Sequence, residues 1–297
     1  MKFITFVLLS LALISVYTKD CGPNYGKCKN NECCSKYGYC GSSSAHCGSG
    51  CQPDYGKCEN NDSGSYPSLG LYSYYEVPDV KELSGLTISK DGSFLWGVGD
   101  SGDLVKISAS SFKVTKVNYF NDDDTEGVTI NRDTGDLLIS VEPNKVYIVT
   151  KSSDFKDYER LFKVSEAKNY GNLGFEGITY YKDNQVYLGS QEGPYLWRVK
   201  FDGEVKEKIE LKKIISGITE VAGLCYDDKR DRLWIIDSEE RKIFLLSGDG
   251  KTLLKTYKVP DINNPESISV DHINKVIWVG DDSKPTSRLY KFDVSNL

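Results

Sequence analysis

Acidic side chains recur at matching places in a pattern that this sequence repeats. Three glutamates each stand directly before a small residue that opens an alternating apolar run: Glu126, Glu176 and Glu266. Further carboxylates follow the small residue fourteen or fifteen positions later, or precede the first of these glutamates: Asp100, Glu142, Glu192, Asp237, Asp282, Asp122, Asp123 and Asp124. Carboxylates gathered on one face repel one another, so their pKa values rise unless a cation neutralises them. Hard cations prefer oxygen ligands, and the pattern predicts a Ca²⁺ or Mg²⁺ site led by the three glutamates.

Other interpretations of these acids stay open. The chain has a formal net charge of −6, so the carboxylates could be solvated loop residues, or they could bind a basic or amine-bearing ligand. Two carboxylates also suffice for a glycosidase. A cation among them would attract the anionic group of a phosphoester or ester substrate, which leaves metal-assisted hydrolysis as a hypothesis.

Several other chemistries are disfavoured. The chain contains only two histidines, His46 and His272, which argues against a Ser-His-Asp triad and against a histidine-based zinc site. We expect His272 in a turn on the face opposite the acids. The negative charge argues against nucleic acid as a partner, and no glycine-rich phosphate loop leads from a strand into a helix.

The elements that must position the acids form a repeat of 40 to 50 residues. Its copies are marked by a small residue at Gly85, Gly127, Gly177, Gly223 and Ser267, with steps of 42, 50, 46 and 44 residues. Each copy continues with a polar turn, a second strand and a third strand. Short antiparallel strands on this period predict a β-propeller, and five copies predict five blades. The segment Leu71–Val77 is expected to supply the outer strand of the fifth blade and close the ring.

The outer strands are the least regular part of the pattern. They are predicted at Val114–Phe120, Ile209–Lys213 and Leu253–Val259, and the second copy has no assigned outer strand. Cys225 falls on a predicted innermost strand, where a buried free thiol is usually inert.

The repeats resemble the SdiA-regulated propeller family, which is related to the esterase-like phytase group. The resemblance rests on Leu83-Ser84-Gly85-Leu86, on the repeated Glu-Gly pairs and on second strands such as Trp96-Gly97-Val98-Gly99-Asp100. It spans roughly Val77 to Val294. It implies the propeller fold more than a particular reaction.

Eight of the nine cysteines lie between Cys21 and Cys58. So short a segment with almost no aliphatic residues cannot build a hydrophobic core, and disulfides must supply its stability in an oxidising compartment. The apolar run Phe3–Val16 behind Lys2 fits a signal peptide and is short for a membrane span. The stretch that follows the cysteines is rich in Asn, Ser, Gly and Pro, as linkers are.

The cysteine-rich segment closely resembles the hevein-like chitin-binding module. The matching residues are Cys21-Gly22-Pro23, Cys33-Cys34-Ser35-Lys36-Tyr37-Gly38-Tyr39-Cys40-Gly41 and Cys47-Gly48-Ser49-Gly50-Cys51. The resemblance implies disulfides Cys21–Cys34, Cys28–Cys40, Cys33–Cys47 and Cys51–Cys58. It also implies a sugar-binding surface in which Ser35 contacts an N-acetyl group and His46 takes the place of a third aromatic residue.

Flat aromatic rings stack on the apolar faces of sugars. Tyr37 and Tyr39 stand two residues apart on a segment that we expect to be strand-like, which would point both rings the same way.

The sequence therefore predicts an all-β protein in which a small disulfide-rich hevein-like domain precedes a five-bladed β-propeller. The expected parts are a signal peptide at 1–19, the hevein-like domain at 20–59, a linker at 60–70 and the propeller at 71–297. We expect a secreted, extracellular or cell-wall protein that binds chitin or N-acetylglucosamine oligomers and has no nucleic acid or membrane partner. The propeller is interpreted as a binding domain with an acidic face that could hold Ca²⁺. The alternative is a hydrolase targeted to cell walls, and the sequence leaves open whether the protein is an enzyme.

Overall fold

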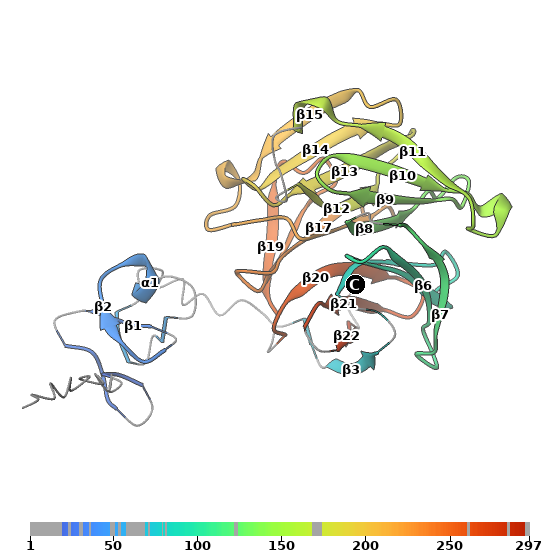
Figure 1. Ribbon diagram of the computed structural model, residues 1–297. Helices are drawn as coiled ribbons and strands as arrows, with labels where there is room; N and C mark the ends of the chain where they lie inside the picture. Colours follow the sequence, from blue (N-terminus) through green and yellow to red (C-terminus); the bar gives the residue numbers. More distant parts are fainter. Residues whose placement is uncertain are drawn as a thin grey trace, which may run out of the picture. The chain divides into compact units, whose positions relative to one another are not determined.

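The chain divides into two compact units, Met1–Ser65 and Tyr66–Leu297 (Figure 1). The computed structural model describes residues 20–22, 25–29, 32–35, 37–47, 51–52, 55–57, 69–70, 72–78, 80, 82–121, 124–167, 174–259, 262–283 and 286–294. The predicted signal peptide and most of the predicted linker lie outside these residues. No helix in the described part of the chain is long and apolar enough to cross a membrane.

Disulfides form the interior of the N-terminal unit. They join Cys21 to Cys34, Cys28 to Cys40 and Cys33 to Cys47, with Cα atoms 5.9, 5.6 and 4.9 Å apart. Cys51 is also disulfide-bonded, and its expected partner Cys58 lies outside the described residues. The regular elements are β1 (Cys33–Cys34), β2 (Cys40–Gly41) and the short helix α1 (Ser44–Cys47).

The described part of the second unit contains five four-stranded antiparallel sheets, the blades of a propeller (Figure 1). Numbered from inner to outer strand, blade 1 has β4 (Leu83–Ile88), β5 (Phe94–Gly99), β6 (Asp103–Ser108) and β7 (Val114–Tyr119). Blade 2 has β8 (Thr125–Ile130), β9 (Leu137–Val141), β10 (Lys145–Val149) and β11 (Tyr158–Lys163). Blade 3 has β12 (Phe175–Tyr180), β13 (Gln185–Ser190), β14 (Tyr195–Lys200) and β15 (Val205–Glu210).

Blade 4 has β16 (Gly223–Asp227), β17 (Arg232–Asp237), β18 (Lys242–Ser247) and β19 (Leu253–Lys258). Blade 5 has β20 (Pro265–Asp271), β21 (Val276–Asp281), β22 (Ser287–Asp293) and, as its outer strand, β3 (Tyr72–Val77). Because β3 pairs with β22, the first strand of the propeller completes the last blade. The predicted fold class and this ring closure are confirmed.

Two outer strands depart from the sequence interpretation. The prediction of an outer strand at Ile209–Lys213 is wrong. The outer strand β15 lies earlier and ends at Glu210, and Leu211–Lys213 forms the 3₁₀ turn η3. Blade 2 does have an outer strand, β11, although none was assigned. Both strands are charged and half exposed, and an edge strand packed on one side carries little of the apolar alternation that reveals a strand. Two further 3₁₀ turns, η1 (Lys151–Ser153) and η2 (Ser165–Ala167), flank β11.

The core lies between neighbouring blades. Each apolar cluster joins the facing sides of two adjacent sheets, as Val98 of blade 1 and Ile139 of blade 2 illustrate. Leu83 of blade 1 and Trp278 of blade 5 meet in the cluster that closes the circle. The ring is therefore held by inter-sheet burial rather than by a single central core.

Inner strands approach one another closely around the axis, at what we call the inner ring: Gly85, Gly127, Gly177, Gly223 and Ser267. A Cβ on Gly127 would lie 2.5 Å from the carbonyl oxygen of Glu176, and one on Gly223 would lie 2.4 Å from that of Glu266. Such distances are impossible for a side chain, so glycine is required where backbone meets backbone. The cavity left inside the ring is about 10 Å³, room for one water at most.

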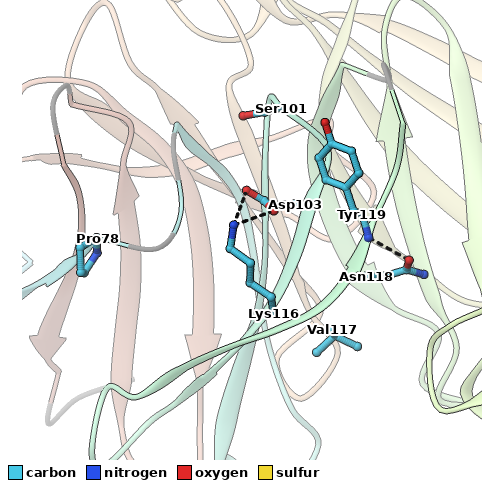
Figure 2. A pocket seen from close by; sticks show the side chains of 7 residues that line it. All are labelled: Pro78, Ser101, Asp103, Lys116, Val117, Asn118 and Tyr119. Atoms are coloured by element: carbon cyan, nitrogen blue, oxygen red, sulfur yellow. Dashed lines mark hydrogen bonds and ion pairs between the residues drawn. The ribbon is translucent and has the colours of Figure 1, made fainter.

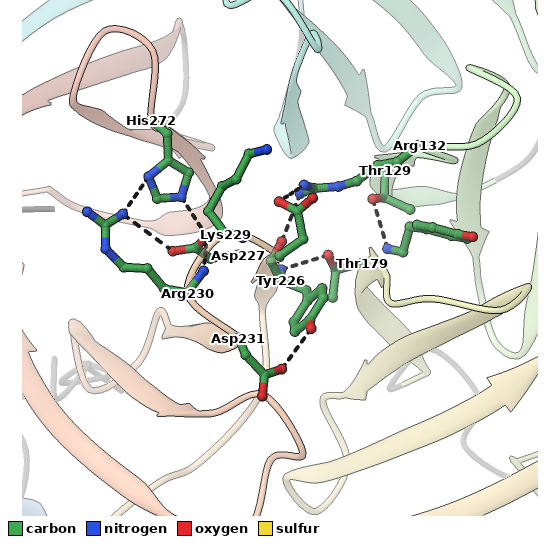
Figure 3. A network of polar contacts seen from close by, with 11 residues as sticks. Thr129, Arg132, Thr179, Tyr226, Asp227, Lys229, Arg230, Asp231 and His272 are labelled. Atoms are coloured by element: carbon green, nitrogen blue, oxygen red, sulfur yellow. Dashed lines mark hydrogen bonds and ion pairs between the residues drawn. The ribbon is translucent and has the colours of Figure 1, made fainter.

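Hydroxyl groups join successive inner strands. The Tyr180 N–H donates to Thr129 Oγ1 at 3.0 Å, and the Tyr226 N–H donates to Thr179 Oγ1 at 2.8 Å (Figure 3). Ser269 Oγ accepts the same kind of bond from Ile88 N at 2.9 Å. Cys225 holds the equivalent position in blade 4, beside the Val270 N–H, and burial raises the pKa of its thiol to about 11. The free cysteine thus occupies the place of a structural hydroxyl.

The face opposite the acids carries a different polar network. The buried Asp227 accepts a hydrogen bond from His272 Nε2 at 2.6 Å, and the Arg230 guanidinium lies 2.6 Å from His272 Nδ1 (Figure 3). Because an arginine can only donate, the contact with Arg230 is a hydrogen bond when His272 Nδ1 accepts and the proton lies on Nε2. His272 links blades 4 and 5, on the face where it was expected.

Replacing Thr179 by valine keeps the side-chain shape and removes the acceptor of the Tyr226 N–H. A buried N–H without a partner costs about 1–3 kcal/mol, so we expect Thr179→Val to lower the free energy of unfolding by that amount, measured by urea denaturation. Cys225→Ser, which restores a hydroxyl at the equivalent place, serves as the control and should change stability less. Equal losses in the two variants would contradict a role for these bonds.

Candidate functional site

The residues expected to bind sugar surround the turn before β2. The ring of Tyr37 is 63% exposed, Tyr39 is half-buried, and Ser35 is buried with its Oγ accepting the Tyr39 N–H at 3.1 Å. His46, in α1, lies 2.8 Å from Ser43 Oγ through Nδ1, and its ring packs on Gly41. The small unit therefore offers one strongly exposed ring beside a fixed polar group.

The expectation of a strand through Tyr37 and Tyr39 is wrong. The chain turns there, because the Gly38 N–H bonds to the Ser35 carbonyl at 2.9 Å and Gly38 has φ 86°. The strand β2 begins only at Cys40. The turn, rather than the period of a strand, sets the directions of the two tyrosines.

A β-bulge places each predicted glutamate of the propeller. In blade 2, Thr125 pairs with Val141 and Gly127 with Ser140, so Glu126 is an extra residue between two rungs of the ladder. The same register shift surrounds Glu176 and Glu266. A bulge re-aims the side chain of its extra residue, and the glutamates are thereby placed at the start of the inner strands β8, β12 and β20.

These glutamates belong to a larger group, the acidic cluster: Asp100, Asp124, Glu126, Glu142, Glu176, Glu220 and Glu266. Burial raises the pKa of Glu126 to about 11, with further contributions from the charges of Asp100 and Glu176. Burial likewise holds the pKa of Glu176 well above its usual range, assisted by Glu220 and Glu142. Burial, then Asp282 and Glu176, raise the pKa of Glu266 to about 9. The three predicted glutamates thus lie on one face and repel one another.

One part of the acidic cluster is compact enough to surround an ion. Oxygens of Asp100, Asp124 and Glu126 all lie within 4.8 Å of one another. Ser84 donates a short hydrogen bond to Asp100, while burial raises the pKa of Asp100 to about 6. This trio shares only Glu126 with the three glutamates named from the sequence. All of its donors are hard oxygens, which fits Ca²⁺ or Mg²⁺ chemistry.

Glu220 is a member that sequence reasoning missed. Blade 4 has no bulge at the start of β16, and its carboxylate comes from three residues upstream of Gly223. Glu220 Oε1 accepts a short bond from Ser238 Oγ and one from the Glu239 N–H at 3.2 Å. The signal that could have found it is its position, three residues before the small residue Gly223 of the repeat.

Among the other acids named from the sequence, three accept hydrogen bonds from nearby groups and one is exposed. Glu142 accepts the Gly174 N–H at 2.7 Å, and burial raises its pKa to about 7. Asp237 is buried and accepts from the Thr219 N–H and hydroxyl, both at 2.8 Å. Asp282 accepts from Asn264 Nδ2 at 3.1 Å. Glu192 is exposed, and Asp122 and Asp123 lie outside the described residues.

Family comparisons divide the chain as the structure does. Residues 20–58 match the family model described as chitin recognition protein. Residues 78–224 match the model described as esterase-like activity of phytase, and residues 198–296 match the SdiA-regulated family.

Curated relatives share only the N-terminal segment. Chitinase 1 of rice (Oryza sativa subsp. japonica) is 46% identical over 50 residues, which is 16% of each chain. The root-specific lectin of barley (Hordeum vulgare) is 43% identical over 46 residues, 15% of this chain and 22% of the lectin. This chain therefore matches less than a quarter of the length of either relative.

Solved structures resemble the propeller only distantly. A luciferin-regenerating enzyme aligns with a TM-score of 0.48 and 12% identity over 74% of this chain and 95% of that chain. A nidogen/laminin complex aligns with a TM-score of 0.47 and 14% identity over 68% and 73% of the two chains. Similarity at this level indicates nothing about activity.

These findings define a protein of two parts. Its first unit is a chitin-recognition module of the hevein type, and its second is a five-bladed propeller of the SdiA-regulated type. Both expected resemblances are confirmed.

The raised pKa values predict how stability depends on pH when no cation is present. In the folded protein the pKa of Asp100 is about 6 and that of Glu142 about 7, both above their ordinary values of 3.8 and 4.5. The folded state therefore binds protons more tightly than the unfolded state, and this stabilisation is lost as pH rises through these values. With chelator present, we expect the melting temperature to fall between about pH 5 and pH 8.

The double variant Asp100→Asn/Glu142→Gln removes both titrations and should make this part of the pH profile less steep. Part of the slope remains, because the pKa values of Glu126, Glu176 and Glu266 are also raised. Carboxyl groups with lowered pKa values, such as Asp91 at about 2, change the stability with pH only below this interval. A wild-type melting temperature that is constant or rising over this interval would contradict the proposed repulsion.

Proposed function

We propose that this protein is secreted and binds chitin or N-acetylglucosamine oligomers through its N-terminal unit, while the acidic face of its propeller binds a divalent cation. The observation that carries the proposal is the chitin-recognition match over residues 20–58, which contains the exposed Tyr37. Secretion is supported by the disulfides of that unit, since such bonds persist in oxidising compartments. The apolar run that precedes it fits a signal peptide.

The proposed saccharide site consists of Ser35, Tyr37, Tyr39 and His46. The Tyr37 ring, 63% exposed, provides a surface on which a sugar face can stack. The buried Ser35 lies next to the turn that holds both tyrosines, and its hydroxyl can orient an acetamido group. His46 is packed on Gly41, so we assign it the edge of the site.

Removing both rings by Tyr37→Ala/Tyr39→Ala should sharply reduce retention on chitin beads. We expect a loss of about tenfold or more per ring, equivalent to ~1.4 kcal/mol for each factor of ten. Tyr25→Ala is the matched control, since Tyr25 is another exposed tyrosine (56%) of the same unit. Undiminished retention of the double variant would refute the assignment.

The acidic cluster is the proposed cation site. Burial and, after it, mutual repulsion raise the pKa values of Glu126, Glu176 and Glu266, and a cation would offset both. Ca²⁺ suits the site because it accepts several carboxylate oxygens in flexible geometry, whereas Mg²⁺ demands a stricter arrangement. The small cavity of about 10 Å³ below the cluster means that an ion would enter and leave from the acidic face.

Adding Ca²⁺ to chelator-treated protein should raise its melting temperature. A ligand at 100 times its Kd stabilises the folded state by about 2.7 kcal/mol, which corresponds to roughly 5–10 °C for a domain of this size. The variant Glu126→Gln/Glu176→Gln should lose this response. A melting temperature that is indifferent to Ca²⁺ would contradict the cation site.

Hydrolysis is the second candidate function. The model described as esterase-like activity of phytase covers residues 78–224, and this range contains every member of the acidic cluster except Glu266. A bound cation would let an otherwise repelling face attract a phosphate or carboxylic ester. Turnover of p-nitrophenyl phosphate or acetate that is lost in Glu126→Gln/Glu176→Gln would favour the hydrolase, and no turnover in the wild type would favour binding alone. A glycosidase that uses two of the carboxylates can be tested with the same variant on N-acetylglucosamine oligomers.

A further inference from the structure

A cleft of about 790 Å³ lies along the outer part of blade 1 (Figure 2). Its lining comes from β7, from the start of β6 and the turn before it, and from the residue after β3: Pro78, Ser101, Asp103, Lys116, Val117, Asn118 and Tyr119. This volume falls within the range of about 300–1,000 Å³ that small-molecule sites occupy. None of the interactions described above for the acidic cluster accounts for this cleft.

Tyr119 provides the cleft with an aromatic surface. Its side chain is 49% exposed, and among the described residues its ring pairs with no other aromatic ring. Its backbone N–H donates to Asn118 Oδ1 at 2.8 Å. Asn118 Nδ2 in turn donates to the carbonyls of Phe155 and Lys156 in blade 2, both at 2.9 Å. Asn118 thus ties the backbone at Tyr119 to the neighbouring blade.

The charges in the cleft cancel. Lys116 Nζ lies 3.1 Å from Asp103 Oδ1, with Lys116 57% exposed and Asp103 13% exposed (Figure 2). A cation or an anion would have to compete with this ion pair. A neutral ligand that carries many hydroxyl groups can instead donate to the carboxylate and accept from the ammonium group without separating them. The hydroxyl of Ser101, also exposed, offers one more donor and acceptor.

An aromatic surface, a balanced ion pair and hydroxyl groups together favour a sugar. We propose that this cleft is a second carbohydrate site, which binds a neutral oligosaccharide of N-acetylglucosamine with one ring stacked on Tyr119. The same chain carries a chitin-recognition module, so the same polymer is available to the cleft. Two sites linked in one chain bind a polymer more tightly than either alone. The inference depends on the chitin recognition of the chain and is independent of the proposed cation.

One turn connects the cleft with the acidic cluster. Asp100 belongs to the cluster, and Ser101, the next residue, lines the cleft. The turn between β5 and β6 therefore contributes a residue to each.

The test uses the full chain with its N-terminal site silenced by Tyr37→Ala/Tyr39→Ala. Binding of the N-acetylglucosamine hexamer is measured by ligand-observed NMR in this background. We expect residual binding, which Tyr119→Ala weakens tenfold or more, while Tyr119→Phe keeps the ring and binds as the silenced parent does. Tyr74→Ala is the matched control, because Tyr74 is an exposed tyrosine (53%) on the outer strand of another blade.

Equal thermal stability of the four proteins excludes a folding defect as the cause. No residual binding in the silenced parent, or equal binding by Tyr119→Ala, would overturn the proposal. If the hexamer stayed as tightly bound after silencing as before, the assignment of Tyr37 and Tyr39 would fail, and the effect of Tyr119→Ala would still decide whether the cleft binds sugar.

Discussion

The close approach of five inner strands around the axis is the constraint on which the propeller depends. At Gly127 and Gly223 the neighbouring strand comes so near that a Cβ would overlap a carbonyl oxygen. The strands can meet this closely only where side chains are absent or very small. Two consequences follow. The axis is left nearly solid, and the bulged residues Glu126, Glu176 and Glu266 are placed at the start of their inner strands.

The acidic face is the outcome of that geometry. In four of the five blades a bulge at the start of the inner strand re-aims one side chain, and in three of these blades that side chain is a glutamate. The carboxylates are then half-buried and close to one another, so burial and mutual repulsion act together to favour protons or cations. Carboxyl groups with pKa values shifted this far by burial and neighbouring charges are typical of functional sites.

Sequence patterns were sufficient for the inner parts of the blades. Small residues at regular intervals and alternating apolar runs located β4, β8, β12, β16 and β20, and with them Glu126, Glu176 and Glu266. The outer strands β11 and β15 were not predicted correctly, because their half-exposed, charged sequences lack a clear alternation of apolar and polar residues. Glu220 was missed because blade 4 supplies its carboxylate from three residues before Gly223 rather than from the residue directly before it. The turn at Gly38 was missed because the positive φ of one glycine overrides the alternation expected of a strand. The cleft at Tyr119 joins residues from two strands and two turns, which no local pattern can reveal.

The order of the two units in the chain has a mechanical consequence. When the N-terminal unit is held on a solid, any pull on the propeller enters through the segment before β3. That segment includes Leu69, which is buried in the cluster of Ile277 and Phe292, and the first rungs to bear load join Tyr72 to Phe292 and Tyr74 to Tyr290. The rings of Tyr72 and Phe292 also touch, with centroids 5.4 Å apart. Resistance to forced unfolding is set by the rate at which such contacts open, so the strand that closes the ring is also the one that anchors it under tension.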